Sequence, residues 1–94
     1  MDYAPSVELL EATHVFPGPY MFKVVGHTSD NFVGRVVSTV RCGLPEDLEP
    51  AFSTRRTANG RHVCVTIEPE LPTAEAVIEL YARLRDVDGV VMLF

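Results

Sequence analysis

The chain holds few of the residues from which metal, redox and disulfide sites are built. Its 94 residues include two cysteines, three histidines and no tryptophan. Cys42 and Cys64 lie too far apart for a C-x-x-C motif, and no third or fourth ligand is spaced with them, so neither a metal ion nor a cofactor is predicted. Two thiols in a chain large enough for its own core are typical of reduced cysteines, which favours a cytoplasmic protein.

Positive charge and long apolar runs are scarce as well. Eight lysines and arginines stand against 13 aspartates and glutamates, which gives a net charge of −5. Such a chain lacks the basic surplus that attracts phosphates, so no nucleic-acid partner is expected. No apolar run approaches the roughly 20 residues of a membrane span. The segment from Met1 to Pro5 has neither the basic nor the apolar region of a signal peptide, so no membrane partner is expected.

What the sequence does contain is an ordered series of strand and helix signals. Alternating apolar residues predict strands, and apolar residues repeated every three to four positions predict helices. The predicted elements are a strand at 20–25, a helix at 30–42, a strand at 49–56, a strand at 61–68, a helix that begins after Thr73, and a strand at 90–94. Pro50 cannot donate to a neighbouring strand, which favours an edge position for the strand that it begins.

This order of elements is the split β-α-β arrangement, run twice. It predicts an α+β fold, a two-layer ferredoxin-like sandwich of βαββαβ topology with an antiparallel sheet in the order 4-1-3-2. Residues 1–19 form a lead-in segment and residues 20–94 form the domain. We expect a two-residue type I′ turn at Asn59-Gly60. The face of the sheet that the helices cover should carry the core residues Tyr20, Phe22, Val24, Phe52, Val63, Val65 and Ile67.

The loop after the first predicted strand is the first candidate site. A glycine lets a backbone approach a ligand, and the free amides of a helix N-terminus attract carboxylates or phosphates. The candidate ligand-binding residues are Gly26, His27, Thr28, Ser29, Asp30 and Asn31. The alternative is that Gly26 only makes a turn, while a hydroxyl or carboxylate of the loop caps the helix.

The uncovered face of the sheet is the second candidate site. The last strand, 90–94, is apolar on both sides, and an apolar edge strand is an association hazard unless something covers it. We expect a second copy of the chain, another protein or the lead-in segment to cover it. The candidate interface residues are Met21, Lys23, Val25, Val91 and Leu93.

No catalytic residues are predicted. His27, Ser29 and Asp30 have the side chains of a hydrolase triad, but three residues in one short loop cannot place acid and nucleophile on opposite imidazole nitrogens. His62 and Cys64 lie two apart on one strand, and two ligands do not make a metal site. The sequence therefore favours a protein that is not an enzyme.

The stretch Phe-Pro-Gly-Pro-Tyr-Met-Phe-Lys-Val-Val-Gly at 16–26 resembles the start of the small bacterial family typified by YbeD. The similarity runs from Leu9 to Phe94, and its further matches are Leu9-Leu10, Asn59-Gly60 and Leu80-Tyr81. The resemblance implies a ferredoxin-like fold close to the ACT regulatory domain, and a function that is not known. ACT domains bind small effectors, often amino acids, near the loop that corresponds to residues 26–31 and at a subunit interface. No functional residue is carried over from the family.

These observations lead to two functional expectations of different kinds. The first is a non-catalytic regulatory or interaction domain that works as a small stand-alone oligomer. The alternative is a sensor of a small metabolite, an amino acid or a carboxylate, that binds at the loop 26–31. An enzyme of unknown type is a distant third.

Overall fold

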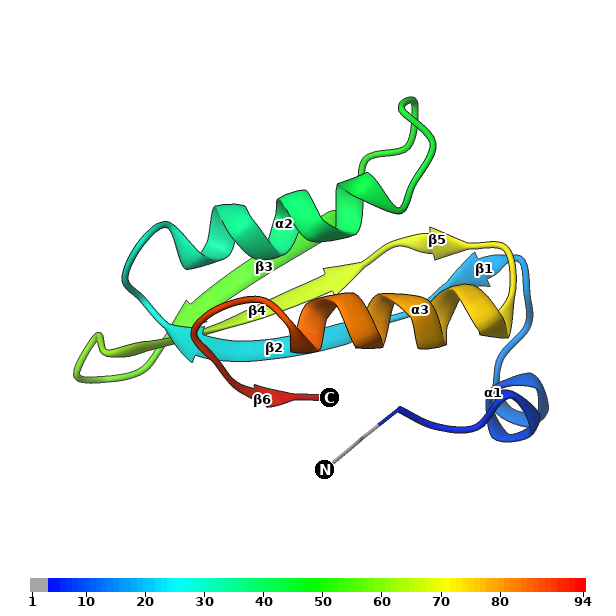
Figure 1. Ribbon diagram of the computed structural model, residues 1–94, viewed down its shortest axis with the longest axis horizontal. Helices are drawn as coiled ribbons and strands as arrows, with labels where there is room; N and C mark the ends of the chain where they lie inside the picture. The colour runs from blue at the N-terminus through cyan, green and yellow to red at the C-terminus, as the bar shows by residue number, and fades with distance from the viewer. Residues whose placement is uncertain (1–3) are drawn as a thin grey trace.

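A four-stranded antiparallel sheet organises residues 4–94, the part of the chain that the computed structural model describes (Figure 1). Its strands lie in the order β3-β4-β2-β6, which confirms the predicted order. The edge strand β3 is the one that Pro50 precedes. The strands are β2 (Phe22–His27), β3 (Ala51–Arg56), β4 (His62–Glu68) and β6 (Val90–Leu93). The first three residues of the predicted lead-in segment lie outside the described range.

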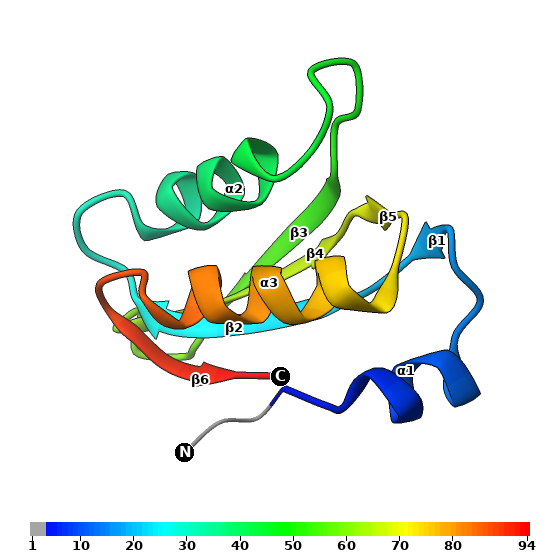
Figure 2. The same cartoon turned by 45° about the vertical axis from the view of Figure 1, so that its right-hand side comes forward.

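Helices α2 (Phe32–Cys42) and α3 (Ala74–Arg85) lie side by side on one face of this sheet, as Figures 1 and 2 show. Thr73 caps α3 as predicted, because its side chain accepts a hydrogen bond from the amide of Ala76. The opposite face of the sheet carries no helix within the described residues. The result is the two-layer sandwich that the sequence predicts, with one layer of helices and one open layer of strands.

The lead-in segment contributes more to the fold than its sequence indicates. It forms α1 (Val7–Thr13), capped by Ser6, and α1 packs against α3. Leu10 on this helix is only 1% exposed and belongs to the main core. After α1 the chain forms β1 (Gly18–Pro19), which pairs with β5 (Glu70–Leu71) in a second, two-stranded sheet that the sequence reasoning missed.

Two local predictions at chain reversals are wrong. The helix predicted from residue 30 begins at Phe32, because Asp30 and Asn31 both take left-handed backbone angles, with φ of 57° and 53°. The capping hydrogen bond expected from a hydroxyl or carboxylate of the loop does not form, and the N-cap residue is Asn31, whose side chain makes no capping hydrogen bond. The hairpin between β3 and β4 is also longer than two residues: Gly60 has positive φ and Asn59 does not, and the turn closes through the Gly60 amide and the Thr57 carbonyl.

The core follows the predicted faces with one exception. Six of the seven expected residues are buried, from Tyr20 at 8% exposed to Phe22, Val24, Val65 and Ile67 at 0%. The prediction that Phe52 is buried is wrong, because its side chain is 48% exposed. It does lie opposite Ile67 on the helix side of the sheet. However, α2 packs over β4 and β2 and leaves the edge strand β3 largely uncovered, so all six residues of β3 are exposed.

Candidate functional site

The loop that joins β2 to α2 is closed by packing at its first residue. A Cβ on Gly26 would lie 2.2 Å from Cζ of Phe32 and 2.7 Å from the carbonyl oxygen of Gly89. The missing side chain therefore makes room for the Phe32 ring and for the turn before β6. The His27 amide donates to the same Gly89 carbonyl at 3.1 Å. Gly26 leaves no space here for a ligand.

The middle of the loop is tied to the hairpin between β3 and β4. The Thr28 hydroxyl donates to the Gly60 carbonyl at 2.8 Å, and the Thr28 amide donates to the Arg61 carbonyl at 3.1 Å. The His27 ring packs at a tilt against the ring of His62, its partner across the strands, with ring centres 4.9 Å apart. These contacts use the polar groups of the loop to hold two chain reversals together.

Arg35 holds the end of the loop, and sequence reasoning did not single it out. Its Nε donates to the carbonyl of Asp30 at 2.9 Å, and its Nη1 donates to the carbonyl of Asp88 at 2.6 Å. The guanidinium also lies 5.6 Å from the centre of the Phe32 ring. One side chain thus joins the loop to the turn between α3 and β6. The sequence gives no local signal of these contacts, because Arg35 lies beside the apolar stripe of the helix and not within it.

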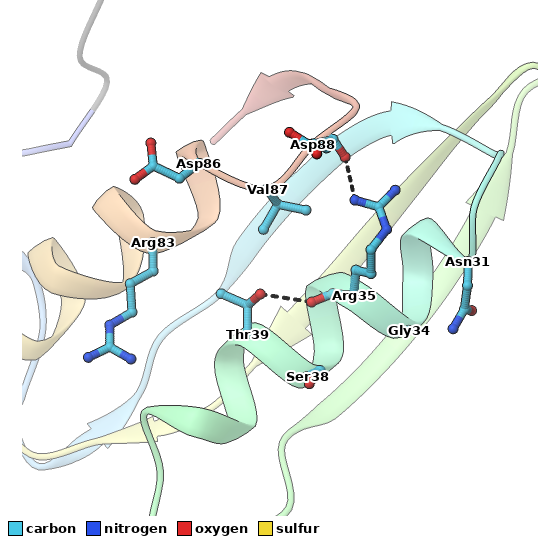
Figure 3. A pocket seen from close by; sticks show the side chains of 9 residues that line it. All are labelled: Asn31, Gly34, Arg35, Ser38, Thr39, Arg83, Asp86, Val87 and Asp88. Carbon is cyan, nitrogen blue, oxygen red and sulfur yellow. Dashed lines mark hydrogen bonds between the residues drawn. The ribbon is translucent and has the colours of Figure 1, made fainter.

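A polar groove lies beside the Arg35 side chain, between α2 and α3 on the helix side of the molecule (Figure 3). Its volume is about 610 Å³ and it opens broadly to solvent. Of the six predicted loop residues, only Asn31 lines it. The other lining residues are Gly34, Arg35, Ser38, Thr39, Arg83, Asp86, Val87 and Asp88. Two arginines, two aspartates and two hydroxyls allow it to hold a small polar molecule with both signs of charge.

Much of the hydrogen-bonding capacity around the groove is already engaged. Arg35 binds two carbonyls, and the Thr39 hydroxyl donates to the Arg35 carbonyl at 2.8 Å. Arg83 forms an ion pair with Glu79 at 2.8 Å, one helical turn away. The Asn31 side chain lies against Gly34, where a Cβ would be 2.4 Å from Nδ2. The arrangement mainly stabilises helix ends.

The open face of the sheet, opposite the helices, presents a different chemistry. Outward positions on β2 carry Lys23, Val25 and His27, and those on β4 carry His62, Cys64, Thr66 and Glu68. Large apolar side chains gather towards β6 and the start of β2, where Met21 is 47% exposed, Met92 48% and Phe94 55%. The term open face is used below for this side of the sheet, with the outward positions of β2 and β4 and the apolar group of Met21, Met92 and Phe94.

The interface residues predicted on the last strand need correction. Leu93 points into the core and is 8% exposed, so it is not available to a partner. Val91 is 50% exposed, at an irregularity in the pairing of β6 with β2. Met92 lies opposite Val25 and Phe94 opposite Lys23, so these two carry the apolar surface instead. Met21, Lys23 and Val25 stand on or beside the open face as predicted by strand alternation.

Titratable groups form no further constellation in the described part of the chain. No three His, Cys, Asp or Glu side chains of residues 4–94 gather closely enough to hold a metal ion. The hydroxyls of Tyr20 and Tyr81 share a buried hydrogen bond of 2.9 Å. Burial, together with this hydrogen bond, raises the pKa of Tyr81 far above its usual value, so the phenol keeps its proton.

None of the helices within residues 4–94 combines the length and the apolar character that crossing a bilayer requires. Among solved structures, the chain is similar to the ACT domain from the GTP pyrophosphokinase of Chlorobium tepidum. The TM-score is 0.60 at 12% identity, and the match covers 82% of this chain and 95% of that one. This likeness shows the fold, which is that of an ACT domain.

Sequence comparison places the chain among bacterial proteins of similar length. A UPF0250 protein of Shewanella piezotolerans is 37% identical over 83 residues, and one of Shewanella halifaxensis is 34% identical over 83 residues. Each match covers 88% of both chains. The family model described as a protein of unknown function (DUF493) matches residues 11–94. The chain therefore belongs to the DUF493 family, the YbeD-like UPF0250 proteins, as its resemblance to that family indicated.

Proposed function

We propose that this protein is a non-catalytic interaction domain that works in the cytoplasm as a small oligomer and binds protein through its open face. The observation that carries the proposal is the exposed apolar group of Met21, Met92 and Phe94 on the face of the sheet that no helix covers within the described residues. Large apolar side chains gathered on one uncovered surface are typical of protein contacts. The ACT fold, which the solved neighbour shares, fits the regulatory role that the resemblance to ACT regulatory domains implies.

The non-catalytic part of the proposal rests on how the polar side chains are used. Arg35, Thr28 and Thr39 donate to backbone carbonyls, and the two buried tyrosines satisfy each other. Groups that are held in this way stabilise loops and helix ends. They do not converge on a common point where a substrate atom would react.

Site-specific photocrosslinking in bacterial cells tests this function. A photoreactive phenylalanine replaces Met92 on the open face in the full chain, and a matched variant carries it at Ser38, which is exposed on α2. We expect adducts of defined mass from position 92 and none from position 38. Adducts at neither position, or equally at both, would reject the open face as a specific binding surface.

The α2–α3 groove supports a second candidate, the sensing of a small polar metabolite. It lies beside Asn31 at the end of the predicted loop and offers two arginines and two aspartates. The test is thermal unfolding in the presence of amino acids and carboxylic acids. A ligand at about 100 times its dissociation constant adds roughly 2.7 kcal/mol to stability. The shift should disappear in Arg83→Ala and persist in Met92→Lys, and a flat panel would reject this candidate.

A further inference from the structure

Two histidines lie side by side at the hairpin end of the open face. His27 is the last residue of β2, His62 is the first residue of β4, and the two are partners in the antiparallel ladder. Their side chains therefore leave the sheet on the same side, and their ring centres are 4.9 Å apart. The β2–α2 loop and the β3–β4 hairpin meet at this end of the sheet (Figure 1).

The backbone around this pair is held in place from both strands. The Thr28 amide donates to the Arg61 carbonyl at 3.1 Å, which joins the residue after His27 to the residue before His62. The His62 carbonyl accepts from the Thr57 amide at 3.0 Å. Because these bonds lie beside the histidines, the fold itself sets the separation of the two rings, and little order has to be gained when they bind something together.

The ring nitrogens of the pair are available as ligands. Neither ring has a hydrogen-bond partner within residues 4–94, whereas Nδ1 of His14 lies 2.9 Å from the Thr13 hydroxyl. His27 is exposed and His62 is half-buried, so solvent and ions reach both rings. A neutral imidazole keeps a lone pair on one nitrogen, and it is the commonest metal ligand among protein side chains.

The spacing of the two rings suits one shared metal ion. An imidazole nitrogen binds zinc at about 2.0–2.1 Å, which puts the ring centre about 3.2 Å from the ion. Two rings on one ion, at nitrogen–metal–nitrogen angles of about 90–110°, then have centres about 4.5–5.2 Å apart. The observed 4.9 Å lies within this range. Turning the rings about their own side-chain bonds is enough to reach a common ion, and the strands need not move.

We propose that His27 and His62 together bind one divalent transition-metal ion of the nickel, copper and zinc group. Ions of this group accept imidazole ligands, whereas Mg²⁺ and Ca²⁺ prefer oxygen. A closed structural site takes four protein ligands, and no three candidate side chains gather within residues 4–94. The site is therefore an open one, with water in the remaining positions. This inference does not depend on the protein contact proposed for the open face.

The charge near the pair limits the affinity. Arg55 lies on β3 opposite Cys64, which is the next outward position along β4 from His62. A guanidinium at this position opposes the approach of a metal cation. Replacing Arg55 with alanine should therefore lower the dissociation constant of the metal, and a higher constant in that variant would place the ion elsewhere.

Nickel binding to the untagged full chain tests the site. Calorimetric titration should show one Ni²⁺ per chain, and Ni²⁺ at about 100 times its dissociation constant should raise the melting temperature by about 10 °C. His27→Ala and His62→Ala each leave a single imidazole, so each should raise the dissociation constant at least about tenfold. His14→Ala, outside the open face, is the matched control. Unfolding without metal verifies that each variant is folded.

Electron paramagnetic resonance of bound Cu²⁺ reports the ligands directly. The spectrum is recorded on the Cys42→Ser/Cys64→Ser double variant, in which no thiol can reduce the metal. Two equatorial imidazole nitrogens are expected there, and only one after either histidine is also replaced. The same double variant should bind Ni²⁺ as tightly as the wild type, because the thiols are not among the ligands.

The outcomes decide whether the pair is a metal site. One ion per chain that is lost in either histidine variant of the pair and kept in His14→Ala supports the proposal. Absence of Ni²⁺ binding overturns it and leaves the two rings as a simple contact between strands. Binding that both histidine variants retain, or that the thiol-free variant loses, overturns it as well, because other groups then hold the ion.

Discussion

Replacing Gly26 with alanine tests whether this residue serves packing or ligand approach. The added Cβ would lie 2.2 Å from a ring carbon of Phe32 and 2.7 Å from the Gly89 carbonyl oxygen. Phe32 is only 1% exposed, so its ring cannot move out into solvent. Overpacking of a tight core costs about 1–3 kcal/mol, and the upper end applies here because one of the two neighbours is backbone.

Alanine also regains up to about 1 kcal/mol over glycine within a strand, so the net loss of unfolding free energy should be about 2 kcal/mol. For a domain of this size that lowers the melting temperature by about 10 °C. Thermal and urea unfolding followed by circular dichroism measure it. Gly43→Ala is the control, because the nearest atom to its added Cβ is a flexible Leu80 methyl at 3.3 Å and the backbone has φ of −92°.

A second substitution identifies the cause of the loss. Phe32→Leu removes the two ring atoms that the new Cβ would meet. In a double-mutant cycle, Gly26→Ala should therefore cost less in the Phe32→Leu background than in the wild type. If Gly26→Ala melts at the wild-type temperature, the packing argument is refuted and the loop is open to a ligand after all.

Three other substitutions have equally direct readouts. Arg35→Ala removes two hydrogen bonds to backbone carbonyls and should lower the free energy of unfolding in urea by about 2 kcal/mol. Because the pKa of Tyr81 is raised in the fold, stability should hold below pH 10, the ordinary tyrosine value, and fall above it by up to about 1.4 kcal/mol per pH unit. Tyr81→Phe should abolish that alkaline slope in pH-dependent urea unfolding. Leu10→Ala should cost about 2–5 kcal/mol, whereas Leu9→Ala, at a 54% exposed position, should cost little in the same assay.

The sequence predicted the strand order and the helix faces because both follow from periodicity. Val24 alternates with Lys23 and Val25, and Val36 and Val40 repeat at helical spacing, so hydrophobic burial alone selects their faces. Phe52 failed the same reasoning for a geometric cause. Its side of the strand was assigned correctly, but alternation does not show how far a helix reaches across an edge strand.

The candidate loop was predicted less well, because its chemistry depends on contacts between distant segments. A glycine after a strand is compatible with a turn, with a ligand and with close packing. Only the positions of Phe32 and Gly89 select close packing. Arg35 likewise gains its role from the carbonyl of Asp88, which lies 53 residues away in the chain. Contacts of this kind leave no local pattern in a sequence.

One irregularity in the sheet decides what the open face offers to a partner. β6 pairs Met92 with Val25 but Val90 with Gly26, so Val91 is an extra residue in the ladder. Strict alternation from Val90 would turn Val91 and Leu93 outward, and a bulge of one residue reverses every later position. Leu93 therefore enters the core, while Met92 and Phe94 face outward.

The bulge lies where β2 has no side chain. Gly26 is the residue that admits the Gly89 carbonyl and the Phe32 ring, and the register of β6 changes at that same residue. The glycine first considered as a ligand contact therefore lies at the step that sets which face of β6 is exposed. In this way a packing feature on the helix side of the sheet is connected to the apolar surface on the open side.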